Sequence, residues 1–327
     1  MLDRVFNRRD GPVTEAPPPR QAAGRKQPGI ALALGGGAAR GWAHIGVLRA
    51  FDEAGLPISM IAGTSIGALV GGCYLAGKLD ELEAFALSLT RRGLIRFLDF
   101  RFGAGGLIGG MRLSRRLSEA LSDLRIEDLD RPLVCVATEA RSGHEVWIDS
   151  GSLVLAMRAS YALPGVFEPL ECGGRSLMDG ALVNPVPVSV CRVYEERFVV
   201  AVNLHYDLFG RAAVMRMRAD PASIPAQGLD LADGTRGEPP LDDLAQRREK
   251  LGMARSMVDA FNIIQDRISR ARLAGDPPDL SLQPRVRDIG LSEFYRAREA
   301  IDHGYEATIS RIAEIRRMTE LAADATR

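Results

Sequence analysis

One stretch of this chain, Ile58–Gly77, constrains the fold more than any other. Its sequence is ISMIAGTSIGALVGGCYLAG: an apolar run suited to a buried strand, then Gly63-Thr64-Ser65-Ile66-Gly67, then an apolar segment of helix length. This order matches the nucleophile elbow, G-x-S-x-G, a sharp strand-to-helix turn that presents a serine hydroxyl. Side chains larger than glycine at positions 63 and 67 would collide with the neighbouring strand or helix. We therefore predict that Ser65 is a nucleophile.

Two other interpretations of this stretch remain open. G-x-S-x-G also occurs by chance in glycine-rich chains. In addition, no charge appears between Gly55 and Lys78, so the stretch resembles a membrane span, and Gly63, Gly67 and Gly71 mimic a small-residue helix face. Against a span, the segment is diluted by Gly, Ser, Thr and Pro, and acidic residues flank both of its ends.

Composition sets broad limits. The 327 residues allow one large domain or two small ones, and Lys+Arg equals Asp+Glu at 42 each, which gives no reason to expect a nucleic-acid partner. The four cysteines lie far apart without a C-x-x-C pair, which indicates reduced core thiols in a cytoplasmic protein. The four histidines have no metal-ligand spacing, so we expect no metal and no cofactor. The N-terminus lacks the apolar segment of a secretory signal.

The chain divides into one domain with three less ordered segments. Residues 1–27 are rich in Pro, Arg and Gly and are predicted to be a disordered tail. Residues 28–320 form the single domain, interrupted by a flexible insertion at 207–247 where Arg, Asp, Pro and Gly dominate. Residues 321–327 are a C-terminal tail.

A second glycine-rich turn precedes the elbow. A buried strand at 29–34 leads into Gly35-Gly36-Gly37-Ala38-Ala39-Arg40-Gly41 and then a helix that ends at Gly55. Strand, glycine loop and helix suggest a site where backbone N–H groups bind an anion. The spacing does not fit a dinucleotide fold, and the absence of Gly-Lys-Ser/Thr excludes a P-loop. We therefore predict an oxyanion loop, with Gly36 and Gly37 favoured as donors.

A carboxylate follows a later strand. Residues 175–178 form a predicted strand that delivers Asp179-Gly180-Ala181, a tight turn with little side-chain cover. Taken alone, Asp179 could simply cap its own backbone. Further strands are predicted at 133–140, 145–149, 198–204 and 279–284. A capping box is predicted at Asp80 and Glu83, and a single final helix from Leu291.

The segment 91–116 mixes apolar residues and glycines with an excess of arginine. One interpretation is a lid or lipid-facing rim, in which arginines meet phosphate headgroups. The other is a pair of surface helices joined by a glycine linker. The basic residues of the first interpretation are Arg91, Arg92, Arg96 and Arg101, and they would place the protein peripherally at the inner face of the membrane.

Three motifs in this order, GGGAARG, GTSIG and DGA, resemble the patatin-like phospholipase family. The segments ALGGGAARGWAHIGVL, MRASYALPGVFEP and LMDGALVNPVPV resemble its bacterial branch in detail, and the likeness covers roughly residues 28–205 and 248–310. One departure is the glycine loop, which has an extra alanine relative to the plant form GGGxRG. The resemblance implies an α/β fold, a mainly parallel sheet flanked by helices in three α/β/α layers.

The resemblance also implies a Ser–Asp dyad that hydrolyses acyl esters of phospholipids or lysophospholipids through an acyl-serine intermediate, without metal or cofactor. Ser65 would be the nucleophile and Asp179 the general base. Gly35, Gly36 and Gly37 would supply the oxyanion N–H groups, and Arg40, Gly41, Gly63, Gly67 and Gly180 would complete the motifs.

Three alternatives stay open beside this dyad. His205 or His303 could complete a triad in the order Ser…Asp…His, although each is more simply interpreted as a surface residue. The same dyad could transfer the acyl group to an alcohol, making a lipid acyltransferase. A catalytically idle scaffold that binds lipid or a protein partner is the third, and the intact Ser65 and Asp179 argue against it.

Overall fold

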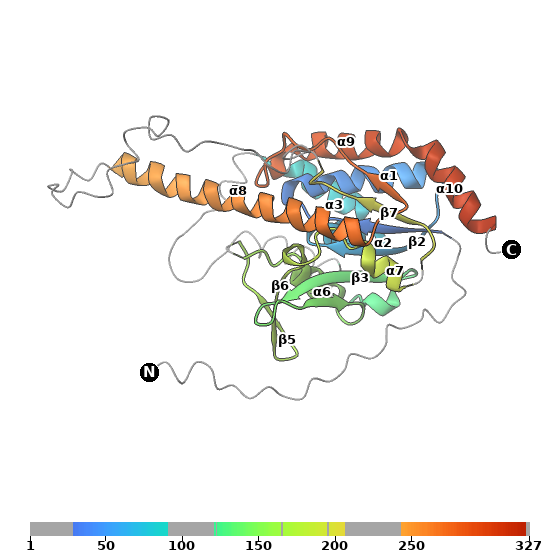
Figure 1. Ribbon diagram of the computed structural model, residues 1–327, viewed down its shortest axis with the longest axis horizontal. Coiled ribbons are helices and arrows are strands. Elements are labelled where there is room, and N and C mark those ends of the chain that lie inside the picture. The colour runs from blue at the N-terminus through green and yellow to red at the C-terminus, as the bar shows by residue number, and fades with distance from the viewer. Residues whose placement is uncertain are drawn as a thin grey trace.

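The computed structural model describes residues 29–90, 121, 123–164, 166–194, 196–206 and 243–324, and for residues 243–258 and 323–324 it describes the backbone alone. Its centre is an eight-stranded sheet with helices on both faces (Figure 1). The predicted α/β class is confirmed, because the central strands run parallel and the antiparallel pairs lie toward one edge.

The strands follow the spatial order β5-β6-β3-β2-β1-β7-β8, with β4 also paired to β3. Strands β3, β2, β1, β7 and β8 are mutually parallel, whereas β4 and β6 run antiparallel to β3 and β5 antiparallel to β6. The strand bounds are β1 Ile30–Leu34, β2 Ile58–Thr64, β3 Leu133–Glu139, β4 Glu145–Ile148, β5 Leu170–Cys172, β6 Arg175–Asp179, β7 Val199–Val202 and β8 Leu280–Leu282.

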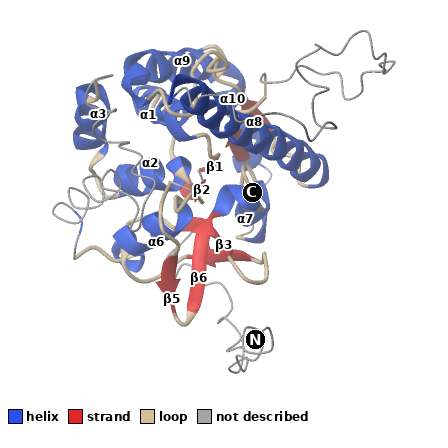
Figure 2. Cartoon of the chain, turned by 90° about the vertical axis from the view of Figure 1, so that its left-hand side faces the viewer, coloured by secondary structure: helices blue, strands red, loops and turns tan. Residues whose placement is uncertain are grey.

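Each face of the sheet has its own hydrophobic core. In β1, Ile30, Leu32 and Leu34 pack into the larger core, whereas Ala31 and Ala33 pack into the smaller one, because alternate residues of a strand point to opposite faces. The larger core takes side chains from α1, α2, α6 and α9, and the smaller one from α7 and the end of α8. Figure 2 shows these two groups of helices on opposite sides of the strands. The arrangement is three layers, as predicted.

The helices have the bounds α1 Ala43–Glu53, α2 Ile66–Leu75, α3 Leu79–Ser88, α6 Leu153–Ser160, α7 Val188–Val193, α8 Asp243–Gly275, α9 Ala297–Ile309 and α10 Ile312–Asp324. Helix α8 is the longest of the described helices, and one end of it projects past the other labelled helices and strands (Figure 1). Within the described ranges, no helix is long and apolar enough to cross a membrane. The stretch Ile58–Gly77 is β2 and α2, not a span.

The register around β3 brings distant residues together. Thr64, the last residue of β2, is paired with Val136, and Asp179, the last residue of β6, is paired with Ala137. The ends of β2 and β6 therefore meet at two successive residues of β3, Val136 and Ala137. The chain immediately after Thr64 and Asp179 must meet there.

Several predicted helix features and segment bounds differ from the structure. Asp80 and Glu83 do not cap α3, whose N-cap Lys78 makes no side-chain cap; both carboxylates bind Arg49 of α1 instead. The single final helix is two helices, α9 and α10, because the helix stops at Ile309. Helix α8 already begins at Asp243, inside the predicted insertion 207–247, and α10 runs past residue 320 to Asp324.

Candidate active site

The nucleophile elbow is present at the end of β2. Ser65 lies between β2 and α2 with φ 57° and ψ −123°, a conformation that costs free energy for a residue with a Cβ. The turn is possible because the glycines on either side of Ser65 let the backbone of α2 lie close to the backbones of β2 and β1. A Cβ at Gly63 would lie 2.5 Å from the Ala68 backbone, and one at Gly67 only 2.2 Å from the carbonyl oxygen of Leu34. The predicted reason for both glycines, a collision with the neighbouring helix or strand, agrees with these distances.

Ser65 and Asp179 are in direct contact. The Ser65 hydroxyl donates a hydrogen bond of 2.6 Å to Oδ2 of Asp179, and the other carboxylate oxygen accepts one of 2.8 Å from the N–H of Ala181. The hydroxyl of Thr138 on β3 donates to the carbonyl oxygen of Asp179 at 2.8 Å. The exposed fraction is 8% for Ser65 and 2% for Asp179. The second and third motifs of the sequence thus meet in one buried pair.

The surroundings of Asp179 adjust its basicity. Burial raises its pKa to about 6, and the hydrogen bonds from Ser65 and Ala181 act in the opposite direction. A carboxylate with this pKa is ionised at neutral pH, yet it is more basic than one in water. Asp179 can therefore accept the proton of the Ser65 hydroxyl without an intervening histidine.

The glycine loop lies against the nucleophile. A Cβ at Gly36 would be 3.5 Å from the Cβ of Ser65. However, the N–H groups of Gly35 and Gly36 already donate to the carbonyl oxygens of Val202 (3.1 Å) and Pro185 (2.9 Å). Neither can serve as an oxyanion donor in this conformation, contrary to the prediction for these two residues.

The next two N–H groups of this loop are the remaining donors. Those of Gly37 and Ala38 have no acceptor among the described residues, and they stand at the start of the short 3-10 helix Ala38–Trp42. Ala38, the first of the two alanines of the motif, has φ 49°. It shares a positive φ with Ser65 alone among the non-glycine residues of the described chain. Strain in the backbone is thus concentrated at the loop and at the nucleophile.

His44 on α1 holds the glycine loop in place, a role for which no prediction was made from the sequence. Its Nε2 lies 2.7 Å from the carbonyl oxygen of Gly35, and because a carbonyl can only accept, Nε2 carries the proton. Burial lowers the pKa of His44 to about 4, despite this hydrogen bond, so the ring is neutral at neutral pH. The side chain is fully buried. Its place in GWAHIGVL, just after the loop, was the available signal.

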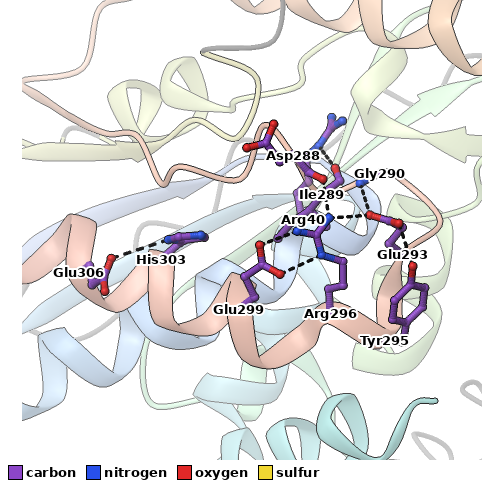
Figure 3. A network of polar contacts seen from close by, with 10 residues as sticks. All are labelled: Arg40, Asp288, Ile289, Gly290, Glu293, Tyr295, Arg296, Glu299, His303 and Glu306. Atoms are coloured by element: carbon purple, nitrogen blue, oxygen red, sulfur yellow. Dashed lines mark hydrogen bonds and ion pairs between the residues drawn. The ribbon is translucent and has the colours of Figure 1, made fainter. Parts of the chain in front are cut away.

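Arg40 does not point at the dyad. Its guanidinium donates to the carbonyl oxygen of Ile289 at 2.7 Å (Figure 3). It also donates to the side chain of Asn262 on α8 at 3.1 Å. Burial lowers its pKa to about 10, which still leaves it charged at neutral pH. A Cβ at Gly41 would overlap Ile66, the first residue of α2. Arg40 and Gly41 therefore fix the glycine loop against its neighbours.

Neither histidine proposed for a triad contacts the dyad. His205 is 1% exposed, so its interpretation as a surface residue was wrong; burial and the charge of Arg40 lower its pKa to about 4. His303 lies on α9 and faces Glu306 at 3.7 Å (Figure 3). No described hydrogen bond joins either ring to Ser65 or Asp179. Among the described residues, the hydrogen bond at Ser65 Oγ is the one to Asp179.

Three further predictions concern the arginine-rich segment, Gly180 and metal binding. Arg91, Arg92, Arg96 and Arg101 lie outside the described residues, so the lipid-facing rim stays a prediction. Gly180 follows Asp179 where a Cβ would be 2.2 Å from the carbonyl oxygen of Val136, which explains the glycine of the DGA motif. Within the described ranges, no group of three or more His, Cys, Asp or Glu side chains could hold a metal ion.

Comparison with known proteins identifies relatives. The family model "Patatin-like phospholipase" matches residues 32–192. An uncharacterised NTE family protein of Mycobacterium bovis is 33% identical over 338 aligned positions, covering 88% of this chain and 92% of that protein. Human patatin-like phospholipase domain-containing protein 6 is 35% identical, and lysophospholipase NTE1 of Mycosarcoma maydis is 37% identical.

The last two relatives are much longer proteins. Each alignment covers 54% of this chain but only 13% of the human protein and 10% of the fungal one. The mycobacterial match, by contrast, spans nearly the whole of both chains. The family match and these relatives together support lipid hydrolysis as the general activity. This chain belongs to the patatin-like phospholipase family, and its mycobacterial relative carries the name NTE family protein.

Proposed function

We propose that this protein is a serine acyl-ester hydrolase of the phospholipase A or lysophospholipase type, with Ser65 as nucleophile and Asp179 as general base. The observation that carries the proposal is the 2.6 Å hydrogen bond from the Ser65 hydroxyl to a buried carboxylate. A nucleophile and a base in direct contact are the minimum machinery of covalent acyl transfer. The names of the relatives supply the lipid as substrate class.

The first half of the reaction forms the acyl-serine. Ser65 Oγ attacks the ester carbonyl carbon while Asp179 Oδ2 accepts the hydroxyl proton. The oxyanion that develops would be stabilised by the free N–H groups of Gly37 and Ala38 and by the N-terminal end of α2. The tetrahedral intermediate then expels the alcohol part of the lipid, which takes the proton from Asp179.

The second half regenerates the enzyme. A water molecule attacks the acyl-serine carbonyl and gives its proton to Asp179, and Ser65 leaves with that proton as the fatty acid is released. An alcohol in place of the water would give acyl transfer through the same steps. The acyltransferase alternative therefore differs only in the acceptor.

Incubation of the purified protein with mixed bacterial phospholipids and lysophospholipids tests the proposal. We expect free fatty acid to accumulate with the wild type but not with Ser65→Ala. Added glycerol or another alcohol distinguishes the two reactions, because an acyltransferase would form new ester at the expense of free fatty acid. Failure to process any lipid ester, with the protein folded, would contradict the proposal and favour a non-catalytic scaffold.

A further inference from the structure

A buried serine outside the dyad bridges the nucleophile to the sheet. Ser160 is the last residue of α6, in the MRASYALPGVFEP segment, and it is fully buried. Its Oγ accepts a hydrogen bond of 2.8 Å from the backbone N–H of Ser65 and lies 2.6 Å from the carbonyl oxygen of Val136 on β3. An N–H can only donate and a carbonyl can only accept. The proton of the Ser160 hydroxyl must therefore point at Val136.

The position of this bridge is defined by the sheet register. Ile61 is paired with Leu133, and its N–H donates to the carbonyl oxygen of Pro132, the residue just before β3. The same parallel pattern, continued by four residues just past the end of β2, would place a bond between the N–H of Ser65 and the carbonyl oxygen of Val136. The Ser160 hydroxyl is inserted at that point. The hydroxyl lets the chain leave the sheet at Ser65 while the N–H of Ser65 and the carbonyl of Val136 each keep a hydrogen-bond partner.

The same segment also holds the base. The N–H of Asp179 donates a hydrogen bond of 3.0 Å to the carbonyl oxygen of Ala162, two residues after Ser160. The backbone N–H groups of both dyad residues are thus bound by one short piece of chain at the end of α6. A shift of residues 160–162 would therefore move Ser65 and Asp179 together. Loss of one of the two hydrogen bonds would let one of them move relative to the other.

We infer that Ser160 is a positioning residue, which holds the strained backbone of Ser65 so that its hydroxyl points at Asp179. This inference rests on the proposed function, because it takes Ser65 as the nucleophile. Without the Ser160 hydroxyl, the N–H of Ser65 and the carbonyl of Val136 would be buried without partners. The backbone at Ser65 would relax, since its φ of 57° is otherwise unfavourable. A small displacement of a nucleophile has a large effect on rate.

The test compares Ser160→Ala and Ser160→Cys with Thr308→Val. The alanine variant removes the hydroxyl, and the cysteine variant keeps a side chain there but bonds weakly. Thr308 is the matched control: its hydroxyl is equally buried and donates to the carbonyl oxygen of Gly304 at 2.9 Å, in α9. For each variant, thermal unfolding, kcat, KM and the rate constant of fluorophosphonate labelling at Ser65 are measured, well below the unfolding temperature.

We expect the two Ser160 variants to lose about tenfold to hundredfold in kcat and in labelling rate, with KM changed by less than about twofold. Thr308→Val should lose stability but keep both rates within about twofold. A purely structural role would make the Ser160 variants behave like Thr308→Val, and wild-type rates in either folded Ser160 variant would overturn the inference. If the wild type itself is not labelled at Ser65, the proposed function fails, and the inference with it.

Discussion

The Oγ of Ser65 and the Oδ2 of Asp179 lie 2.6 Å apart although 114 positions separate the two residues in the sequence. The contact exists because β2 and β6 pair with consecutive segments of β3 and both strands end at the point where these segments join. The pair is buried, and its carboxyl group has a pKa suited to accepting a proton near neutral pH.

Asp179→Asn should lower kcat/KM by at least about hundredfold, because an amide cannot take the proton of Ser65. His303→Ala is the matched control, and its activity should be close to that of the wild type, since His303 faces Glu306 and not the dyad. Steady-state assays with a soluble ester check both. If the folded His303→Ala variant or a folded His205→Gln variant lost two orders of magnitude in kcat/KM, a triad with that histidine would be supported instead.

Activity should fall as pH drops through about 6, because protonated Asp179 cannot act as a base. The profile of log kcat/KM against pH should show one acidic limb with its midpoint near that value. Neither His44 nor His205 accounts for such a limb, since the pKa of each is lowered to about 4. A midpoint near 4 would therefore argue against Asp179 as the group that titrates.

Asp179→Asn should also be more stable than the wild type at neutral pH. The pKa of Asp179 rises from an ordinary 3.8 to about 6 on folding, so between these values the folded protein binds more protons than the unfolded chain. The wild type therefore loses stability as pH rises from about 4 to about 6, by about 3 kcal/mol at most, and the variant does not. Urea unfolding at several pH values measures the difference, and equal pH dependence of the two proteins would contradict it.

Gly67→Ala should destabilise the protein by about 2 kcal/mol or more, because its Cβ would meet the Leu34 carbonyl oxygen at 2.2 Å. Gly275→Ala is the control, since nothing lies within 4 Å of a Cβ there, and it should stay within about 0.5 kcal/mol of the wild type. Chemical unfolding compares the two. Similar stabilities for both variants would show that α2 does not approach β1 as closely as described.

The sequence was sufficient to predict those parts of the site that depend on local pattern. An apolar strand followed by G-x-S-x-G predicts an elbow at Ser65, and a strand ending in Asp-Gly-Ala indicates Asp179, because both signals lie within a few residues. The three-layer fold was likewise predictable from alternating strands and helices together with the family motifs. The burial of His205 could not be predicted in this way, because it depends on packing against α8.

The parts that the sequence could not supply are long-range hydrogen bonds. The N–H groups of Gly35 and Gly36 are taken by Val202 and Pro185, residues far along the chain, so their loss as oxyanion donors has no local signal. Ser160 meets Ser65 across 95 positions, and only the sheet register shows why a hydroxyl is needed there. Asp80 and Glu83 form a plausible capping box in sequence, yet the arginine of another helix binds them both.

The measurement that tests the central claim most directly is the site of labelling by a fluorophosphonate probe. Such a probe phosphonylates an activated serine, and mass spectrometry of the digested protein locates the adduct. We predict a rapid, single adduct on Ser65 that is absent in Ser65→Ala and strongly slowed in Asp179→Asn, with the unmodified proteins equally folded. An adduct on another serine, or full activity in protein that carries no adduct after treatment, would contradict the assignment of Ser65 as the nucleophile.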